Sequence, residues 1–237
     1  MEIVGHRGLP LKHVENTVGS FDDAFKNGAD AIELDVHLTL DNVPIVFHDF
    51  DLKRLAGIDS KIYELTLSQI KKIYLGNDLI PTLEEVIKRF SNKKIYVELK
   101  TIDEKGKRYD DALPEILHKR FGEYYKNIVF ISFDPKSISE LRSYSEKYVL
   151  GLDYDENSEL ILPFPSMYNF LTENRIEYFL PDVKIIKKSI NLLDSKFKIA
   201  PWTINDISIV ENYMKYLSGI ISDRCDIISK QIKDTTY

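Results

Sequence analysis

The chain has 237 residues, of which 43% are hydrophobic and 30% charged, and it contains one cysteine. This composition excludes a disordered chain, a disulfide framework and a cysteine-rich zinc site. The formal net charge of −6 argues against nucleic acid as a partner, because a phosphate backbone is bound by an excess of Lys and Arg. No apolar run is long enough to span a membrane and no signal peptide is visible, so we expect a soluble, cytoplasmic protein.

Short apolar segments alternate with amphipathic ones along the chain. The expected strands are residues 3–5, 31–36, 95–99, 128–131, 148–152, 177–180, 198–202 and 219–222. Start signals open expected helices at residues 18–26, 86–90, 136–146, 207–217 and 227–233. This alternation predicts an α/β fold, a compact (β/α)8 TIM barrel formed by residues 1–237 as a single domain. A doubly wound sheet would need a glycine-rich phosphate loop after the first strand, and no such loop is present there.

The segment between the second expected strand and the capping box at Thr82 breaks this rhythm. Asp41-Asn42 is a usable two-residue hairpin turn. A hairpin centred between these two residues would place Asp35 opposite His48. We therefore expect an antiparallel strand at residues 44–48 outside the eight, followed by a small insertion over the barrel mouth. Hairpin and insertion together occupy about residues 37–80.

Acidic side chains in two of the expected strands point into the barrel. Glu33 and Asp35 share one face of their strand, and Glu98 shares a face with Lys100, because side chains alternate with period two. The apolar residues between them face the helices, so the carboxylates face inward, where ionised carboxylates need a cation. Three carboxylates at one mouth are suitable ligands for Mg²⁺ or Ca²⁺. The alternative is an ion-pair network with Lys100 and Arg7.

Two histidines are candidates for acid–base catalysis. His6 and His48 each end an apolar segment at the same mouth, and imidazole titrates near neutral pH. Arg7, next to His6, offers a planar guanidinium for a phosphate oxygen. The alternative for this arginine is a pairing with Glu2 or Glu15.

The other three histidines are given no catalytic role. His118 lies among charged residues of a helix and is expected at the surface. His37 lies on the outward face of its strand, beside the hairpin. His13 lies in a polar loop, and its role stays open.

The motifs that carry these polar residues resemble, in order and spacing, the glycerophosphodiester phosphodiesterase family of the phosphatidylinositol phospholipase C-like barrels. They are His6-Arg7-Gly8, Glu15-Asn16-Thr17, Glu33-Leu34-Asp35-Val36, Val46-Phe47-His48-Asp49 and Glu98-Leu99-Lys100. Further matches extend the resemblance from residue 3 to about residue 226. Two positions depart from the family pattern: Val14 stands where Pro is usual, and Arg224-Cys225 follows Ser222-Asp223 where the family ends Thr-Asp-x-Pro.

The resemblance implies a (β/α)8 barrel that binds one divalent cation, Mg²⁺ or Ca²⁺. The implied metal ligands are Glu33, Asp35 and Glu98. The implied general acid and base are His6 and His48. Implied contacts to the phosphate and the rest of the substrate come from Arg7, Asn16, Lys100 and Trp202.

The sequence therefore predicts metal-dependent hydrolysis of a small-molecule glycerophosphodiester to glycerol phosphate and an alcohol. One alternative is a lysophospholipase D or sphingomyelinase-like enzyme of the same superfamily, which would need an apolar mouth; we assign the apolar residues of the insertion to its own small core. An enolase-like or aldolase-like barrel would not need two histidines and an arginine beside the metal. A barrel that binds a phosphorylated ligand without turnover would not need both histidines. The leaving alcohol, the native metal and the oligomeric state stay open.

Overall fold

The computed structural model describes residues 1–192 and 196–235. The strands of its main sheet are β1 (Glu2–Gly5), β2 (Ala31–Leu38), β3 (Pro44–Val46), β6 (Lys94–Leu99), β7 (Ile128–Ser132), β8 (Val149–Tyr154), β9 (Tyr178–Pro181), β10 (Lys198–Ile199) and β11 (Gly219–Ser222). The helices of the outer layer are α1 (Val18–Lys26), α4 (Leu83–Arg89), α5 (Leu113–Phe121), α6 (Pro135–Tyr144), α7 (Phe164–Glu173), α8 (Ile186–Leu192) and α9 (Cys225–Thr235).

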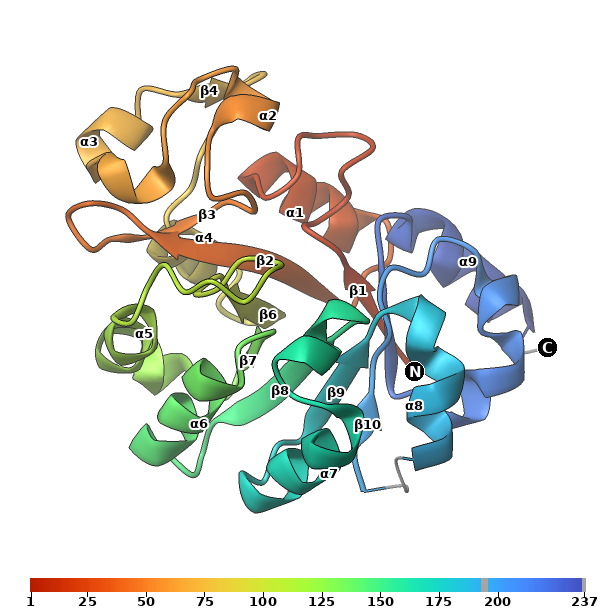
Figure 1. Ribbon diagram of the computed structural model, residues 1–237. Coiled ribbons are helices and arrows are strands. Elements are labelled where there is room, and N and C mark those ends of the chain that lie inside the picture. Colours follow the sequence, from red (N-terminus) through yellow and green to blue (C-terminus); the bar gives the residue numbers. More distant parts are fainter. Residues whose placement is uncertain (193–195, 236–237) are drawn as a thin grey trace.

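Within the described residues, eight parallel strands form a barrel surrounded by helices (Figure 1). Their hydrogen-bonded order is β10-β9-β8-β7-β6-β2-β1-β11. The ring closes between β10 and β11, where Ser218 N donates to Ile199 O (2.8 Å) and Ile221 N donates to Pro201 O (3.0 Å). The predicted (β/α)8 barrel is confirmed, with strands at all eight expected places.

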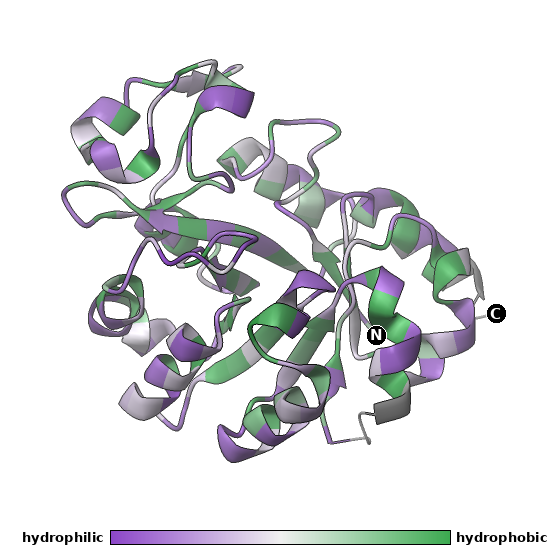
Figure 2. Cartoon of the chain, in the orientation of Figure 1, coloured by the Kyte–Doolittle hydropathy of each residue, from purple (hydrophilic) through white to green (hydrophobic). Residues whose placement is uncertain are grey.

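Hydrophobic residues run along the barrel strands, as Figure 2 shows in green. One face of each strand packs against the helices, and the other face fills the barrel interior. The interior residues are Val4, Ala31, Tyr96, Val129, Ile131, Tyr178, Leu180, Ala200 and Ile221. The end of the barrel where the strands begin, here called the lower end, is closed by Lys94. Its Nζ donates to Glu2 Oε2 (2.8 Å) and to the Tyr178 hydroxyl (2.8 Å). Polar side chains in phase with the interior residues therefore emerge at the upper end, where the strands finish.

The expectation of an α-helix at residues 207–217 is wrong. The segment forms two 3-10 helices instead, η5 (Ile207–Ile209) and η6 (Glu211–Tyr216). Its β-branched start and its two tyrosines have low α-helix propensity, which accounts for the difference.

The hairpin register predicted around Asp41-Asn42 is also wrong, by one residue. β3 pairs antiparallel with β2 so that Val36 lies opposite Val46, and the Phe47 N–H donates to the Asp35 carbonyl (3.0 Å). The turn is a three-residue loop at 40–42 that ends with Asn42 in the left-handed region (φ 57°), rather than a two-residue loop. His48 therefore lies one position beyond the residue opposite Asp35.

The insertion forms a small unit beside β3 with a core of its own. It contains α2 (Lys53–Ala56), η1 (Ile62–Glu64), α3 (Leu67–Ile70) and the hairpin of β4 (Tyr74–Leu75) and β5 (Asp78–Leu79). Its core consists of Ile45, Phe47, Leu52, Ile62, Ile70, Leu75 and Ile80. The assignment of the insertion's apolar residues to a core of its own holds for Leu52 and Ile62, whereas Ile58 and Tyr63 are exposed.

A search of the described helices finds none with the length and apolar character needed to cross a membrane.

Candidate active site

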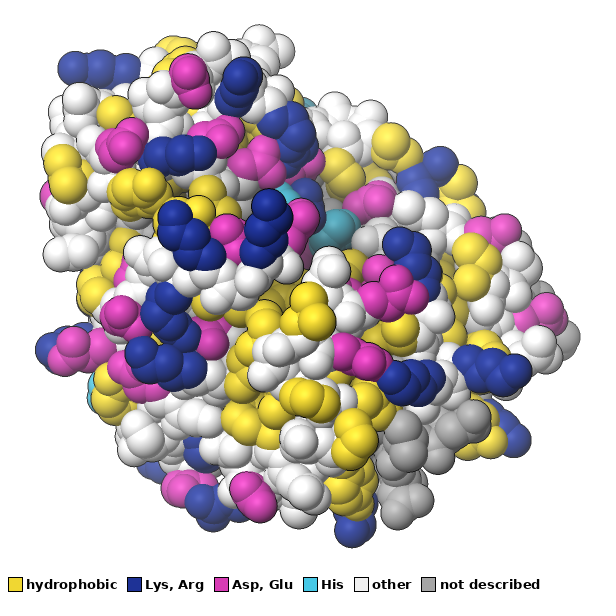
Figure 3. Space-filling view, in the orientation of Figure 1, with side chains coloured by type: hydrophobic (Ala, Val, Ile, Leu, Met, Phe, Trp, Pro, Cys, Tyr) yellow, Lys and Arg dark blue, Asp and Glu magenta, His cyan; other side chains and the backbone are white. Residues whose placement is uncertain are grey.

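The upper ends of the strands surround a cavity of about 720 Å³. Figure 3 shows this face, with histidine side chains (cyan) in the hollow and acidic and basic side chains around it. The cavity is lined by the residue that directly follows each of several strands: His6 after β1, Lys100 after β6, Phe133 after β7 and Asp182 after β9. The C-terminal face of a (β/α)8 barrel is where such enzymes carry their active sites.

Three carboxylates converge at this mouth. Glu33 and Asp35 project from β2 and Glu98 from β6, and Asp35 lies directly opposite Glu98 in the parallel register. One oxygen from each carboxylate lies within 4.8 Å of the others. Two oxygens at about 2.4 Å from a shared Ca²⁺ ion are at most about 4.8 Å apart, and hard oxygen ligands of this kind are also those that Mg²⁺ takes.

Two basic side chains contact the same cluster. Lys100 Nζ lies 2.9 Å from Asp35 Oδ1 and 2.6 Å from Glu98 Oε1. Arg7 Nε lies 3.3 Å from Asp35 Oδ2, and the Arg7 backbone N–H donates to Glu33 Oε2 (2.9 Å). The ion-pair network that was the alternative to a metal site therefore exists, and the question is whether it balances the charge.

The charge does not balance. Three carboxylates face two cations, and one of these cations, Arg7, also pairs with Glu15. Burial raises the pKa of Glu33 well above its usual range, and the neighbouring Asp35 and Glu98 reinforce the shift. Burial also raises the pKa of Glu98 to about 7, against the attraction of a lysine. A divalent cation would supply the positive charge that the cluster lacks, and the donor set therefore fits one.

Asp35 is held ionised in the same cluster. Burial opposes its ionisation, but Lys100 and Arg7 together keep its pKa well below the usual range. Asn16 Nδ2 donates to Asp35 Oδ2 (2.7 Å), whereas Asp35 Oδ1 has no hydrogen-bond partner of good geometry among the described residues. Its ion pair with Lys100 leaves a lone pair of this oxygen for a ligand.

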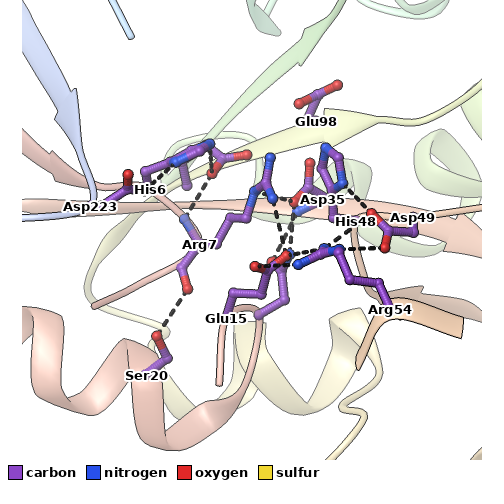
Figure 4. A network of polar contacts seen from close by, with 12 residues as sticks. His6, Arg7, Glu15, Ser20, Asp35, His48, Asp49, Arg54, Glu98 and Asp223 are labelled. Carbon is purple, nitrogen blue, oxygen red and sulfur yellow. Dashed lines mark hydrogen bonds and ion pairs between the residues drawn. The ribbon is translucent and has the colours of Figure 1, made fainter. Parts of the chain in front are cut away.

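His6 and His48 are each held by a carboxylate at the same ring nitrogen. His6 Nδ1 lies 2.7 Å from Asp223 Oδ1, and His48 Nδ1 lies 2.7 Å from Asp49 Oδ1. In Figure 4 the two imidazoles lie on either side of the Arg7 side chain. Because each Nδ1–H donates to its carboxylate, each Nε2 is left to accept or deliver a proton at the cavity.

Further residues fix these two carboxylates in place. Asn205 Nδ2 donates to Asp223 Oδ2 (2.9 Å), and Arg54 Nε donates to Asp49 Oδ2 (2.7 Å). Hydrogen bonding by the histidine keeps the pKa of each aspartate low, against the effect of burial. Both aspartates lie within the motifs described in the sequence analysis, but the motifs alone assign neither of them a role.

The remaining histidines do not share the carboxylate-held arrangement of His6 and His48 at the cavity. The buried His37 donates from Nε2 to the His48 carbonyl (2.9 Å), and burial lowers its pKa to about 4, so it is a neutral support that the sequence analysis missed. His118 is half-buried and not free at the surface as expected, because its Nδ1 contacts the Tyr148 hydroxyl (2.6 Å). His13 lies between two surface aspartates.

Arg7 makes one of the two pairings considered for it. Its Nη1 donates to Glu15 Oε1 (3.0 Å), in addition to the contact with Asp35. Arg7 and Asn16 both have left-handed backbones (φ 53° and 60°), which turn their side chains from the loop after β1 towards the acidic cluster.

The opposite wall of the cavity is aromatic and acidic. The Trp202 indole donates to the Leu180 carbonyl (2.8 Å), and its ring meets Phe133 edge-on at 5.6 Å. Asp153 faces the cavity from β8, in phase with the inward-facing Val149 and Gly151. Burial and the nearby acidic cluster raise its pKa well above the usual range. The sequence signal that identifies Asp153 is its spacing, because it lies two and four residues after positions that face the barrel interior.

Comparisons with known proteins agree on one family. The model of the glycerophosphoryl diester phosphodiesterase family matches residues 6–227. A bovine glycerophosphodiester phosphodiesterase 1 is 30% identical over 161 residues, 63% of this chain; the chain spans about half of that relative (47%). A glycerophosphodiester phosphodiesterase of Caldanaerobacter subterraneus is 26% identical over 232 residues, 93% of each chain. The crystal structure of such an enzyme from Thermotoga maritima matches 98% of each chain, with a TM-score of 0.79 and 31% identity.

Proposed function

Because the chain belongs to the glycerophosphoryl diester phosphodiesterase family and is an enzyme of that class, we propose that it hydrolyses glycerophosphodiesters with the help of a divalent cation and two histidines. The products are glycerol phosphate and an alcohol. The observation that carries the proposal is the acidic cluster of Glu33, Asp35 and Glu98. The basic side chains around it do not balance its charge, and it lies beside two imidazoles that are each hydrogen-bonded to an aspartate.

The acidic cluster would hold the cation, and two basic side chains would hold the phosphate. Bound Mg²⁺ or Ca²⁺ supplies positive charge that polarises the phosphodiester. Lys100 stays protonated, since Asp35 and Glu98 raise its pKa against the effect of burial. Arg7 is likewise permanently cationic and lines the cavity, where its guanidinium suits a phosphate oxygen.

His6 and His48 would move the two protons of the reaction. One imidazole accepts the proton of the attacking oxygen at Nε2, and the other donates a proton to the leaving alkoxide. Burial lowers the pKa of His48, and Lys100 contributes to the shift, so this imidazole is neutral near pH 7. A neutral imidazole suits the role of base, and we therefore assign His48 to the attacking oxygen and His6 to the leaving group.

The chemistry is tested by turnover and by product identity. Purified protein freed of metal by chelation is incubated with glycerophosphocholine and glycerophosphoglycerol, and release of glycerol phosphate is followed with and without added Mg²⁺ or Ca²⁺. Turnover that requires the cation supports the proposal. Binding of the substrates without turnover under every condition would support the non-catalytic barrel instead.

A lysophospholipase D activity is the second candidate, because one edge of the mouth is apolar. Leu160 and Ile161 are exposed (87% and 40%), and Ile161 lines the cavity. An acyl chain leaving the cavity on this side would cover both residues. Faster release of the head group from lysophosphatidylcholine than from glycerophosphocholine would favour this activity.

A further inference from the structure

We propose that Asp153, together with Asp182 and the indole of Trp202, forms a subsite for a positively charged leaving group, so that the enzyme prefers glycerophosphodiesters of amino alcohols. This inference rests on the proposed function, because it concerns the alcohol half of the same substrate. The ligand chemistry is an ammonium group, either quaternary or primary, joined through a short chain to the phosphate.

The strongest observation is a buried carboxylate with nothing to bind. Asp153 is 3% exposed and lines the cavity, and its Oδ2 is buried without a hydrogen-bond partner among the described residues. Asp153 also forms no ion pair with any residue in the described ranges 1–192 and 196–235. A buried carboxylate is costly unless it is paired, so this side chain fits a cationic or hydrogen-bond-donating ligand.

The three residues of the subsite lie side by side at the ends of neighbouring strands. The residue after Asp153 is Tyr154, whose carbonyl accepts a hydrogen bond from the Asp182 N–H (2.8 Å). Asp182 in turn forms a parallel bridge with Trp202. The subsite therefore follows one arc of the barrel mouth, from β8 through the end of β9 to the end of β10.

Aromatic and acidic side chains together suit an ammonium group. The indole of Trp202 is held by its bond to the Leu180 carbonyl, and Phe133 meets it edge-on. A cation over an indole face is attracted by the ring quadrupole, most strongly where water is excluded. Asp182 uses Oδ1 to cap the backbone of Lys184 (2.8 Å), which leaves its other oxygen for a ligand.

Among the described residues that line the cavity, every lysine and arginine precedes β7 in the chain. Arg7 and Lys100, which suit the phosphate, follow the ends of β1 and β6. Among the described lining residues from β7 onward there are three carboxylates, Asp153, Asp155 and Asp182, and no lysine or arginine. A substrate with an anionic phosphate and a cationic alcohol matches both halves, whereas a neutral alcohol leaves the buried Asp153 unpaired.

The test compares cationic and neutral leaving groups in one series. We expect the wild-type protein to show a kcat/KM for glycerophosphocholine or glycerophosphoethanolamine at least about tenfold above that for glycerophosphoglycerol. Asp153→Asn keeps the shape and removes the negative charge that a bound ammonium group would favour on Asp153, so it should lower this ratio about tenfold or more. Glu104→Gln removes one exposed charge from the rim of the cavity and should leave the ratio unchanged.

A second variant and a second probe keep the test independent of how well Asp153→Asn folds. Asp182→Asn should lower the same ratio about threefold, because the residue is more exposed. Tetramethylammonium should inhibit hydrolysis of glycerophosphoglycerol competitively in the wild type and more weakly in both variants.

The outcomes separate the inference from the proposed function. Equal kcat/KM for all three substrates, or an Asp153→Asn variant that loses activity on all of them alike, would overturn the inference while leaving the phosphodiesterase intact. A wild type that hydrolyses none of the three with any cation would instead overturn the proposed function itself.

Discussion

Glu98→Gln should make the metal-free protein more stable while removing its metal dependence. In the metal-free protein, burial raises the pKa of Glu98 from 4.5 to about 7, since the attraction of Lys100 does not offset burial and the repulsion of Asp35. The ionised form of Glu98 is therefore less favourable in the folded protein than in the unfolded chain. Glutamine has the shape of the protonated acid and avoids that penalty.

The magnitude follows from the shift in pKa. A rise from 4.5 to about 7 corresponds to roughly 3 kcal/mol between the two protonation states of Glu98. The folded-state pKa is the higher one, so the penalty is absent below the unfolded pKa and is complete above pH 7. Glu98→Gln should thus raise the free energy of unfolding by about 2–3 kcal/mol at pH 8, and by less than about 1 kcal/mol at pH 5.

Urea unfolding in the presence of a chelator at both pH values provides the measurement. Glu84→Gln is the matched control, because Glu84 is an exposed glutamate paired with Lys88 on α4, and its change should stay within about 0.5 kcal/mol. Saturating Mg²⁺ or Ca²⁺ should stabilise the wild type, by about 2.7 kcal/mol at a hundred times Kd, and Glu98→Gln much less. A Glu98→Gln protein that is clearly less stable at pH 8 would refute the reasoning, since the contact with Lys100 would then be a structural ion pair.

Three further predictions concern catalysis. His6→Ala and His48→Ala should each lower kcat at least about 100-fold in steady-state assays, while thermal unfolding stays close to that of the wild type. A histidine whose substitution lowers kcat less than about threefold would have no part in the mechanism. With saturating cation, so that the acidic cluster stays ionised, the acid limb of the pH profile of kcat/KM should lie below the ordinary imidazole pKa of about 6.5. Burial lowers the pKa of His48, and protonation removes the base; an acid limb above that value under these conditions would contradict the assignment. If the substrate's own glycerol hydroxyl attacks the phosphorus, a substrate lacking that hydroxyl should react at least about 1,000-fold more slowly with little change in binding, and comparable rates would favour attack by water.

Much of the fold was predictable because its signals are local. Strand positions follow from short apolar runs, and the inward direction of Glu33, Asp35 and Glu98 follows from period-two alternation alone. The hairpin register was not predictable, because a three-residue loop that ends at Asn42 and a two-residue turn share the same sequence signal.

The supporting contacts of the site were beyond sequence reasoning because they are remote in the chain. His6 and its partner Asp223 are 217 positions apart, and only the pairing of β1 with β11 brings them together. Asp153 was missed for a different reason. A single acid at the end of an apolar strand also fits a solvent-exposed loop, and its burial depends on how neighbouring strands and loops enclose the mouth.

The most direct measurement is the initial rate of glycerol phosphate release by metal-stripped protein as Mg²⁺ or Ca²⁺ is added back, with glycerophosphocholine and glycerophosphoglycerol as substrates and Glu98→Gln assayed in parallel. We predict no release in chelator, recovery of the wild-type rate on adding the cation, and no recovery by Glu98→Gln at concentrations that saturate the wild type. Undiminished release by the wild type in chelator would contradict the account.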